Sequence, residues 1–166
     1  MEGKKSKPRA LLIFGAPCSG KTTFSEKFSW RFDLAYYNFD EISEQYRLSR
    51  KNVLLLIELL TRTGKNLIIE GGLGTEKERA EVRNVLRACG YEPTLVWIQT
   101  DISTIRLRMK RLYKSVSAAR EAYDTAVASL EAPTEVEKPV ILSGKHTFET
   151  QARHILAGLA DSEQTK

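Results

Sequence analysis

Residues 9–23 read RALLIFGAPCSGKTT, in which an apolar stretch leads into a loop with glycine at positions 15 and 20. The loop residues are Gly15, Ala16, Pro17, Cys18, Ser19, Gly20, Lys21 and Thr22, followed by Thr23. They match G-x-x-x-x-G-K-[ST] at every fixed position, and a chance match in a chain of this length is on the order of one in two hundred. Residues 10–14 predict a strand and residues 21–32 a helix, which is the context that this motif requires.

The residue types of this loop suit the binding of phosphate groups. Glycine at positions 15 and 20 permits backbone conformations that aim successive amide hydrogens inward, and the start of the helix adds the positive end of its dipole. Lys21 can reach β- and γ-phosphates as a point charge, and the Thr22 hydroxyl suits one coordination position of Mg²⁺. We therefore expect residues 15–23 to bind a nucleoside triphosphate, with Mg²⁺ arriving on the nucleotide.

Cys18 is the unusual residue of the loop, and Ser19 and Thr23 are further hydroxyl donors near it. Cys18 is interpreted as a small space-filling side chain; the alternative is a redox role, because the N-terminus of a helix lowers the pKa of a thiol. Cys89 is the second cysteine, and two cysteines cannot form a disulfide framework. We expect both to be free thiols, and no spacing of cysteine or histidine indicates a transition-metal site.

Beyond the loop, predicted strands alternate with predicted helices. Apolar or β-rich runs predict strands at residues 10–14, 36–39, 67–69, 94–99 and 140–142. Apolar periodicity and capping residues predict helices at 21–32, 40–63, 75–90, 102–113, 117–130 and 148–159. This alternation predicts an α/β fold of the P-loop NTPase type, a three-layer α/β/α sandwich with a five-stranded parallel sheet and with ligands at the carboxyl ends of the strands.

Length and composition favour one domain. A chain of 166 residues with 42% apolar and 28% charged residues can close one core and is too short for two ordinary domains. We expect a flexible basic N-terminus at 1–8, a single domain at 9–160 and a polar tail at 161–166. The longest apolar run, residues 53–57, is far short of the roughly 20 residues of a membrane span, and no secretory cleavage signature is present. These features predict a cytoplasmic protein, monomeric or homodimeric, without a membrane segment.

Two carboxylates stand where strands of the predicted sheet end. Asp40 follows the second strand and Glu70 ends the third, so both should lie at the same edge of the sheet as the loop. Asp40 is interpreted as the base or anchor for an acceptor hydroxyl, with a plain helix N-cap as the alternative. Glu70 is interpreted as a ligand of Mg²⁺, or of a water beside it, together with Thr22.

The formal net charge of +5 favours polyanionic partners, and part of the excess lies on the helix predicted at 102–113. Arg108 and Arg111 are spaced i, i+3 and share one face of that helix, where they could neutralise charge on a transferring phosphoryl group. A solvated helix face is the alternative interpretation of this run, which also contains Arg106.

Three further arginines are candidates for the acceptor side. Arg47, on the helix predicted at 40–63, could contact an anionic acceptor or take part in a surface salt bridge. Arg79 and Arg83 lie on the helix predicted at 75–90. They are interpreted as exposed helix charges, with acceptor binding as the alternative.

Five segments give the chain a resemblance to a known family: GAPCSGKTT at 15–23, FDEI at 39–42, LIIEGG at 67–72, IRLRMKR at 105–111 and PVILSGKHT at 139–147. Over about residues 9–159 the chain resembles the small P-loop kinases that include zeta-toxin-like, polynucleotide-kinase-like and antibiotic-phosphotransferase-like proteins. The resemblance implies a nucleoside-kinase-like fold, a role for Asp40 in binding or deprotonating the acceptor hydroxyl, an arginine-rich lid, and a loop at 143–145 near the adenine. The family more often has aspartate where this chain has Glu70, and its acceptors are diverse.

Phosphoryl transfer uses all of these features. We expect a Mg-ATP-dependent kinase that transfers the γ-phosphoryl group to a hydroxyl of a small molecule or of a nucleic-acid end, with Lys21, Asp40, Arg108 and Arg111 as catalytic residues. The alternative is a nucleotide-binding regulatory ATPase module that acts through a partner. A third interpretation, nucleic-acid binding by a basic surface, draws on the aromatic residues at 36–39. The sequence has no N-K-x-D segment for guanine, which argues against a GTPase switch.

Overall fold

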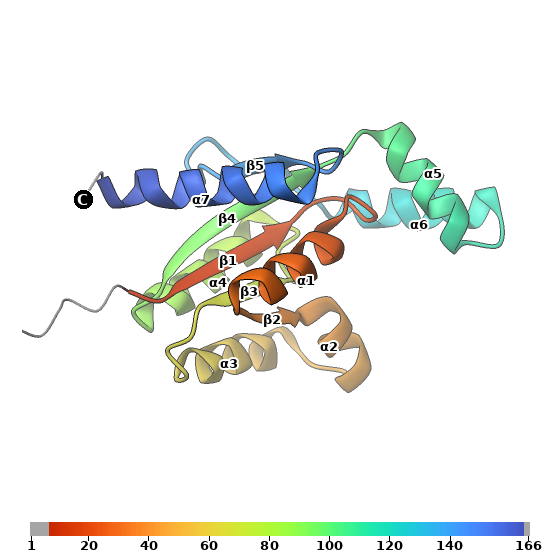
Figure 1. Cartoon of the computed structure of the whole chain (residues 1–166). Helices are drawn as coiled ribbons and strands as arrows, with labels where there is room; N and C mark the ends of the chain where they lie inside the picture. The colour runs from red at the N-terminus through yellow and green to blue at the C-terminus, as the bar shows by residue number, and fades with distance from the viewer. Residues whose placement is uncertain (1–6, 165–166) are drawn as a thin grey trace, which may run out of the picture.

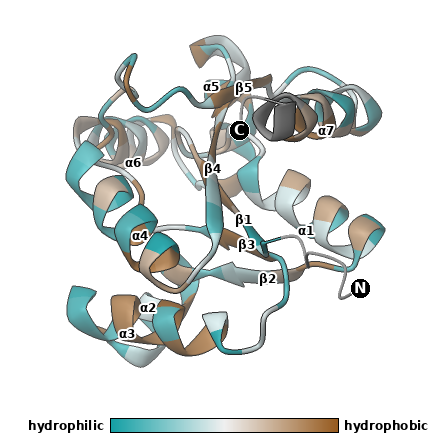
Figure 2. Ribbon diagram, turned by 90° about the vertical axis from the view of Figure 1, so that its left-hand side faces the viewer, coloured by the Kyte–Doolittle hydropathy of each residue, from teal (hydrophilic) through white to brown (hydrophobic). Residues whose placement is uncertain are grey.

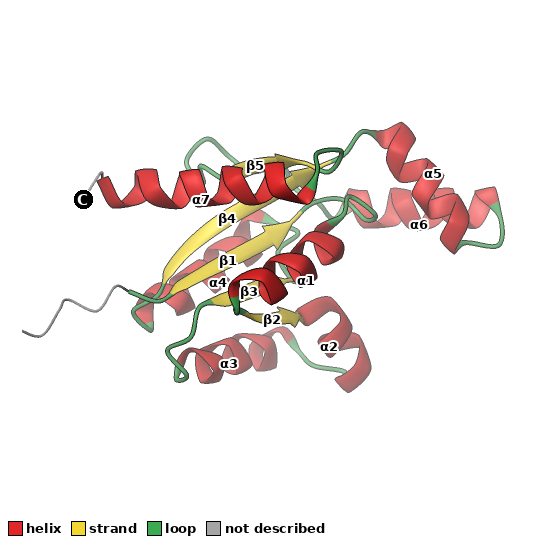
Figure 3. Ribbon diagram, viewed as in Figure 1, coloured by secondary structure: helices red, strands yellow, loops and turns green. Residues whose placement is uncertain are grey.

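A computed structural model describes residues 7–164 and shows a parallel sheet between two layers of helices (Figure 1; Figure 3). The strands are β1 (Arg9–Phe14), β2 (Ala35–Asn38), β3 (Leu67–Glu70), β4 (Glu92–Gln99) and β5 (Val140–Ser143). The helices are α1 (Lys21–Phe32), α2 (Phe39–Tyr46), α3 (Arg50–Thr61), α4 (Glu76–Ala88), α5 (Ile102–Leu112), α6 (Val116–Ala128) and α7 (Phe148–Gln164). The predicted α/β fold with a five-stranded parallel sheet is confirmed.

The strands lie in the order β2-β3-β1-β4-β5, and every neighbouring pair is parallel. The central strand β1 is apolar on both faces, and residues 10–14 are each at most 3% exposed. β3 pairs with it on one side, with Ile13 opposite Glu70, and β4 on the other, with Phe14 opposite Trp97. β2 and β3 lie on one side of β1, and β4 and β5 lie on the other. Because all strands are parallel, the loops after β1, β3 and β4 lie at the same edge of the sheet, where open α/β sheets bind ligands.

Side chains of alternate strand residues enter two separate cores. The core on one face is shared with α1 and α7 and includes Leu11, Ile13, Phe24, Phe28 and Ile155. The core on the opposite face is shared with α3 and α4 and includes Leu12, Phe14, Ile57, Val82 and Leu86. Figure 2 shows these two helix layers on opposite sides of the sheet. Burial of each such large apolar side chain contributes about 1.5–3 kcal/mol relative to exposure, which fixes the helices against the sheet.

Helices α5 and α6 extend beyond the carboxyl ends of the strands (Figure 1). A small core of Ile105, Met109 and Ala119 joins the two helices, and Ala16 and Cys18 pack against it. The helix pair therefore lies over the glycine-rich loop after β1. The contact of Cys18 with this core agrees with its interpretation as a space-filling side chain.

The single helix predicted at 40–63 is wrong, because this segment forms two helices. Arg47 adopts a left-handed conformation (φ 51°, ψ 45°) that ends α2. The Ser49 side chain then accepts the amide N–H of Asn52 and begins α3. A left-handed residue and a new cap within three positions turn the chain, although neither glycine nor proline marks the break.

The start of α2 also differs from the prediction. The Asn38 side chain accepts the amides of Asp40 and Glu41, so Asn38 is the N-cap and Phe39 is already helical. Asp40 therefore lies in the first turn of the helix. Its carboxylate does not cap the helix, so the alternative interpretation of Asp40 as the N-cap is wrong.

The last helix, α7, runs to Gln164, past the end predicted at residue 159. No glycine or proline follows residue 159 to stop it, so the boundary predicted between domain and polar tail falls inside a helix. Of the basic segment predicted at 1–8, residues 1–6 lie outside the described residues. Among the helices that the structure describes, none is both long and apolar enough to cross a membrane.

Candidate active site

The loop between β1 and α1 has the backbone of an anion-binding site. Gly15 (φ 147°) and Gly20 (φ 105°) have the positive φ angles that favour glycine, and Cys18 (φ 56°) lies in the left-handed region. A Cβ on Gly15 would fall on the carbonyl oxygen of Ile98 in β4, so the close approach of loop and sheet also requires glycine. Gly20 begins α1 without a side-chain cap, which leaves the first amides of the helix for an anion.

Lys21, the first residue of α1, bends back over this loop and donates from Nζ to the carbonyl of Ala16 at 3.0 Å. Burial lowers the pKa of its ammonium group, while Glu70, Asp40 and Cys18 act in the opposite direction. An ammonium group has three donors, so this contact leaves donors for an anion. A phosphate beside Lys21 would favour the charged form of the ammonium group, against the effect of burial.

Glu70 ends β3 beside the loop and is only 3% exposed. Its two carboxylate oxygens accept hydrogen bonds from the hydroxyls of Thr22 (2.8 Å) and Tyr36 of β2 (2.9 Å). Because the Thr22 proton points to Glu70, the lone pairs of Thr22 Oγ1 can face a cation. Burial and the Glu70 carboxylate raise the pKa of the Tyr36 phenol, so it remains a donor at neutral pH. Glu70 thus orients Thr22, as a residue next to a metal ligand would.

Tyr36 is the part of this arrangement that sequence reasoning missed. Alternation in a buried strand explained its aromatic side chain equally well, so it carried no separate signal. Tyr36 lies two residues before the end of β2, and β2 pairs with β3, the strand that ends at Glu70. This position near the carboxyl ends of the strands was the one indication available.

A cavity of about 630 Å³ opens between the loop, α5 and the connection from β5 to α7. Its lining includes Gly20, Lys21, Thr22, Thr23, Arg108, Arg111, Gly144 and His146. Arg108 donates from its two terminal nitrogens to the carbonyls of Cys18 (2.9 Å) and Gly144 (3.3 Å). The structure therefore brings Arg108 and Arg111 together beside the phosphate loop, whereas Arg106 lines a separate cavity between α5 and α6.

The loop after β5 borders this cavity closely. A Cβ on Gly144 would collide with the Thr100 side chain and the Ser19 carbonyl, so this contact with the phosphate loop requires glycine. Lys145 pairs with Asp101 at the start of α5 at 2.6 Å, which holds the pKa of that carboxyl well below its usual range. The segment that the resemblance places near the adenine is thus connected to both the phosphate loop and the start of α5.

A second cavity, of about 400 Å³, lies at the ends of β1 and β3. Its lining includes Phe14, Gly15, Pro17, Lys21, Asp40, Gly71, Gly72, Leu73, Gly74, Thr75, Glu78 and Leu130. The exposed Asp40 accepts the amide of Gly72 on Oδ1 at 2.9 Å. A Cβ on Gly71 would collide with Asp40, so the glycine turn after β3 is what lets this carboxylate stand here. Lys21 lines both cavities.

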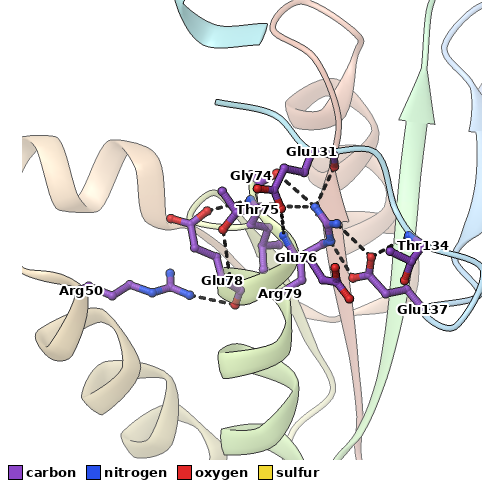
Figure 4. A network of polar contacts seen from close by, with 10 residues as sticks. Arg50, Gly74, Thr75, Glu76, Glu78, Arg79, Glu131, Thr134 and Glu137 are labelled. Atoms are coloured by element: carbon purple, nitrogen blue, oxygen red, sulfur yellow. Dashed lines mark hydrogen bonds and ion pairs between the residues drawn. The ribbon is translucent and has the colours of Figure 1, made fainter. Parts of the chain in front are cut away.

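The expectation that Arg79 is an exposed helix charge is wrong, because Arg79 is completely buried. Its guanidinium group makes a bidentate ion pair with Glu137 at 2.7 and 2.9 Å (Figure 4). Its Nη1 also donates to the carbonyls of Leu73, Gly74 and Glu131. Arg79 therefore joins the glycine turn that lines the second cavity to the segment that follows α6.

The remaining arginine candidates lie elsewhere. Arg83 is half-buried on α4, where burial and the neighbouring Arg87 lower its pKa. Arg47 is exposed at the end of α2, and its left-handed backbone is its evident structural role.

The residues present fit a nucleoside triphosphate with Mg²⁺. Ser19 is completely buried, and its hydroxyl has no hydrogen-bond partner within the part of the chain that the structure describes. Such a group indicates a missing partner, which a ligand on the loop could supply. Thr22 and Glu70 offer oxygen ligands, which Mg²⁺ prefers. In such sites, water and phosphate oxygens fill the other coordination positions of the ion.

Comparison with solved structures shows the same fold in two kinases and in Kti12, a protein solved with ADP-AlF3. A gluconokinase from Sinorhizobium meliloti 1021 has a TM-score of 0.72 at 18% identity, over 97% of each chain. APS kinase CysC from Mycobacterium tuberculosis, in complex with AMPPNP and APS, has a TM-score of 0.69 at 16% identity, over 93% of this chain and 98% of that chain. Kti12 from Chaetomium thermophilum, in complex with ADP-AlF3, has a TM-score of 0.69 at 14% identity, over 92% and 97%.

The sequence also matches a protein family. The model of the AAA domain family AAA_33 matches residues 11–133, well over half of the chain, and this range contains the phosphate loop, Asp40, Glu70 and helices α5 and α6. No curated protein matches the sequence significantly. The chain belongs to the AAA domain family AAA_33 and has the fold of the small P-loop kinases.

Proposed function

We propose that the protein is a Mg-ATP-dependent kinase that transfers the γ-phosphoryl group to a hydroxyl of an acceptor bound in the second cavity. The observation that carries this proposal is the position of Lys21, which lines both the cavity of the phosphate loop and the cavity that contains Asp40. A donor phosphate in one cavity and an acceptor hydroxyl in the other would meet beside one ammonium group. Both cysteines are free thiols, which fits a cytoplasmic enzyme.

The residues of the site would act mainly by positioning and by charge neutralisation, as phosphoryl transfer requires. The acceptor oxygen attacks phosphorus, its proton passes to the Asp40 carboxylate, and the electron pair of the breaking bond leaves with ADP. Lys21, Arg108 and Arg111 neutralise charge on the phosphoryl oxygens. Mg²⁺, when bound at Thr22, would supply further neutralisation of the phosphates.

The test is transfer of labelled γ-phosphate to a panel of 5′-hydroxyl oligonucleotides, nucleosides, sugars and amino sugars. We expect Asp40→Asn to lower kcat by at least about 100-fold, because the general base is lost. The KM for ATP should change little, since Asp40 is outside the phosphate cavity. Asparagine keeps the oxygen that accepts the Gly72 amide, so the turn after β3 should remain in place.

Glu41→Gln is the matched control, since it removes the neighbouring exposed carboxylate from the same helix. Its kcat should equal that of the wild type. Undiminished transfer by Asp40→Asn would remove Asp40 from the mechanism. ATP hydrolysis without transfer to any acceptor would contradict the kinase and favour a regulatory ATPase module.

A further inference from the structure

The second cavity has features that select among acceptors, if the proposed kinase activity is correct. Its volume of about 400 Å³ is in the range of small-molecule sites. Phe14, Leu73 and Leu130 give it an apolar wall, while Asp40 and Glu78 stand among its polar groups. The cavity is therefore sized for a small molecule with both an apolar face and hydroxyl groups.

The charged groups of this cavity are carboxylates, apart from Lys21. Glu78 is held in place because its Oε2 accepts the amide of Thr75 at 2.9 Å in the capping box of α4. Lys21 also lines the cavity of the phosphate loop, and the negative charges of Glu70 and Asp40 already act on it. A phosphate or carboxylate on the acceptor would lie beside two negative charges, which strongly disfavours its binding.

Two arginines that do not line the cavity, Arg50 and Arg79, donate hydrogen bonds to residues that do (Figure 4). Arg50 donates from its three nitrogens to the carbonyls of Gly72 and Glu78, each at 2.8 Å, and to Glu81 at 3.0 Å. The buried Arg79 donates to one carboxylate and three carbonyls. Arginine is the usual partner of phosphate and carboxylate ligands, yet here both guanidinium groups bind residues of the protein that line the cavity.

We propose that the acceptor is a small hydroxyl compound without negative charge, such as a neutral or amine-bearing sugar or cyclitol. Its hydroxyls donate to the carboxylates of Asp40 and Glu78, and an ammonium group on it pairs with the same oxygens. The apolar wall packs against the carbon face of its ring. Nucleotides, sugar phosphates, sugar acids and polynucleotide ends are disfavoured by the two carboxylates.

Matched acceptor pairs test this inference on the whole chain with labelled Mg-ATP. Sugars, cyclitols, amino sugars and nucleosides are each assayed beside their phosphorylated or carboxylated derivatives. We expect kcat/KM for the uncharged or amine-bearing member to exceed that for its anionic derivative by at least about tenfold.

Glu78→Gln tests the electrostatic cause. Glutamine can keep the capping box, so the helix start is retained while one charge is removed. The kcat/KM of the anionic member relative to the neutral one should rise about tenfold. Glu76→Gln, an exposed carboxylate in the same helical turn, is the control and should leave this ratio unchanged. If the role of Glu78 were purely structural, the substitution would lower kcat/KM for both members of a pair equally.

The outcomes separate this inference from the kinase proposal. Transfer that favours the anionic members overturns the inference and leaves the kinase standing. Transfer to no member, with ATP still bound, overturns both. An unchanged ratio in Glu78→Gln overturns the role of the carboxylates in selectivity.

Discussion

Lys21 is the residue on which the proposed chemistry depends, and its environment is unusual for a lysine. It is half-buried beside Glu70 and Asp40, and desolvation is the stronger influence, so its pKa lies below the ordinary value of 10.5. A bound triphosphate adds negative charge at the ammonium group and raises this pKa again. Nucleotide binding and protonation of Lys21 are therefore linked.

This linkage predicts a pH dependence of ATP binding. Affinity should be constant below the pKa of Lys21 in the free protein and should fall as the pH rises through that pKa, because binding must then take up a proton. The fall should begin at a lower pH than an unperturbed lysine would give. Titration calorimetry with Mg-ATP between pH 7 and about 10 measures it, in a Cys18→Ser background that removes the neighbouring thiol.

Lys21→Arg is the control for this titration. A guanidinium stays charged over the whole range, so the variant should bind ATP with an affinity that does not change with pH. The same alkaline fall in both proteins would assign the titration to another group.

At this scale, the sequence was sufficient for residues whose role is local. The phosphate loop is one continuous segment, and its glycines, Lys21 and Thr22 are recognisable from spacing alone. Tyr36 and Glu137 were not recognisable, because their roles depend on partners far away in the chain: Glu70 for Tyr36 and Arg79 for Glu137.

Among the elements, the break between α2 and α3 shows where periodicity was a poor guide. Arg47 ends α2 with φ 51°, a conformation that costs a residue with a Cβ more than it costs glycine. Its side chain is exposed, so little packing depends on it. The apolar pattern continues through the break, which is why a single helix was predicted.

We expect Arg47→Gly to raise the free energy of unfolding by about 0.5–1 kcal/mol, because glycine adopts the left-handed conformation without strain. Urea denaturation of the two proteins measures the difference. Arg47→Ala keeps the Cβ and should show no such gain. Equal stabilities of the glycine and alanine variants would mean that this backbone conformation does not limit stability.

Over the whole molecule, Arg79 connects parts that the sequence separates widely. Its guanidinium lies 4.7 Å from the ring centroid of Phe14, the residue before the phosphate loop. It also holds the glycine turn at Leu73 and Gly74 and the segment from Glu131 to Glu137. The glycine turn of the second cavity and the segment after α6 are therefore both bound to one buried cation.

We expect Arg79→Met to lower the free energy of unfolding by about 3–5 kcal/mol, because it leaves the buried Glu137 carboxylate without its partner. Glu137→Leu should cost a similar amount. The double variant should lose clearly less than the sum of the two, since neither charge is then left alone. Urea denaturation of the four proteins gives this cycle, and additive losses would contradict the coupling.

The dependence of the free energy of unfolding on pH, on the acid side, provides a second measurement of the Arg79–Glu137 pair. The hydrogen bonds from Arg79 lower the pKa of Glu137 below its ordinary value of 4.5. The contribution of Glu137 to the free energy of unfolding is therefore fully present above pH 4.5 and is lost as the pH falls through the lowered pKa. Glu137→Gln should flatten this part of the curve relative to the wild type.

The sequence by itself determined the fold class, the phosphate loop and the edge of the sheet where Asp40 and Glu70 stand. These features follow from local spacing and from the rule that parallel strands present their carboxyl ends together. The tertiary structure alone decided which side chains meet: Tyr36 with Glu70, Arg79 with Glu137, and Lys21 between two cavities. The physical reason is that a buried charge is stable only beside its partner, and the packing of distant segments supplies that partner.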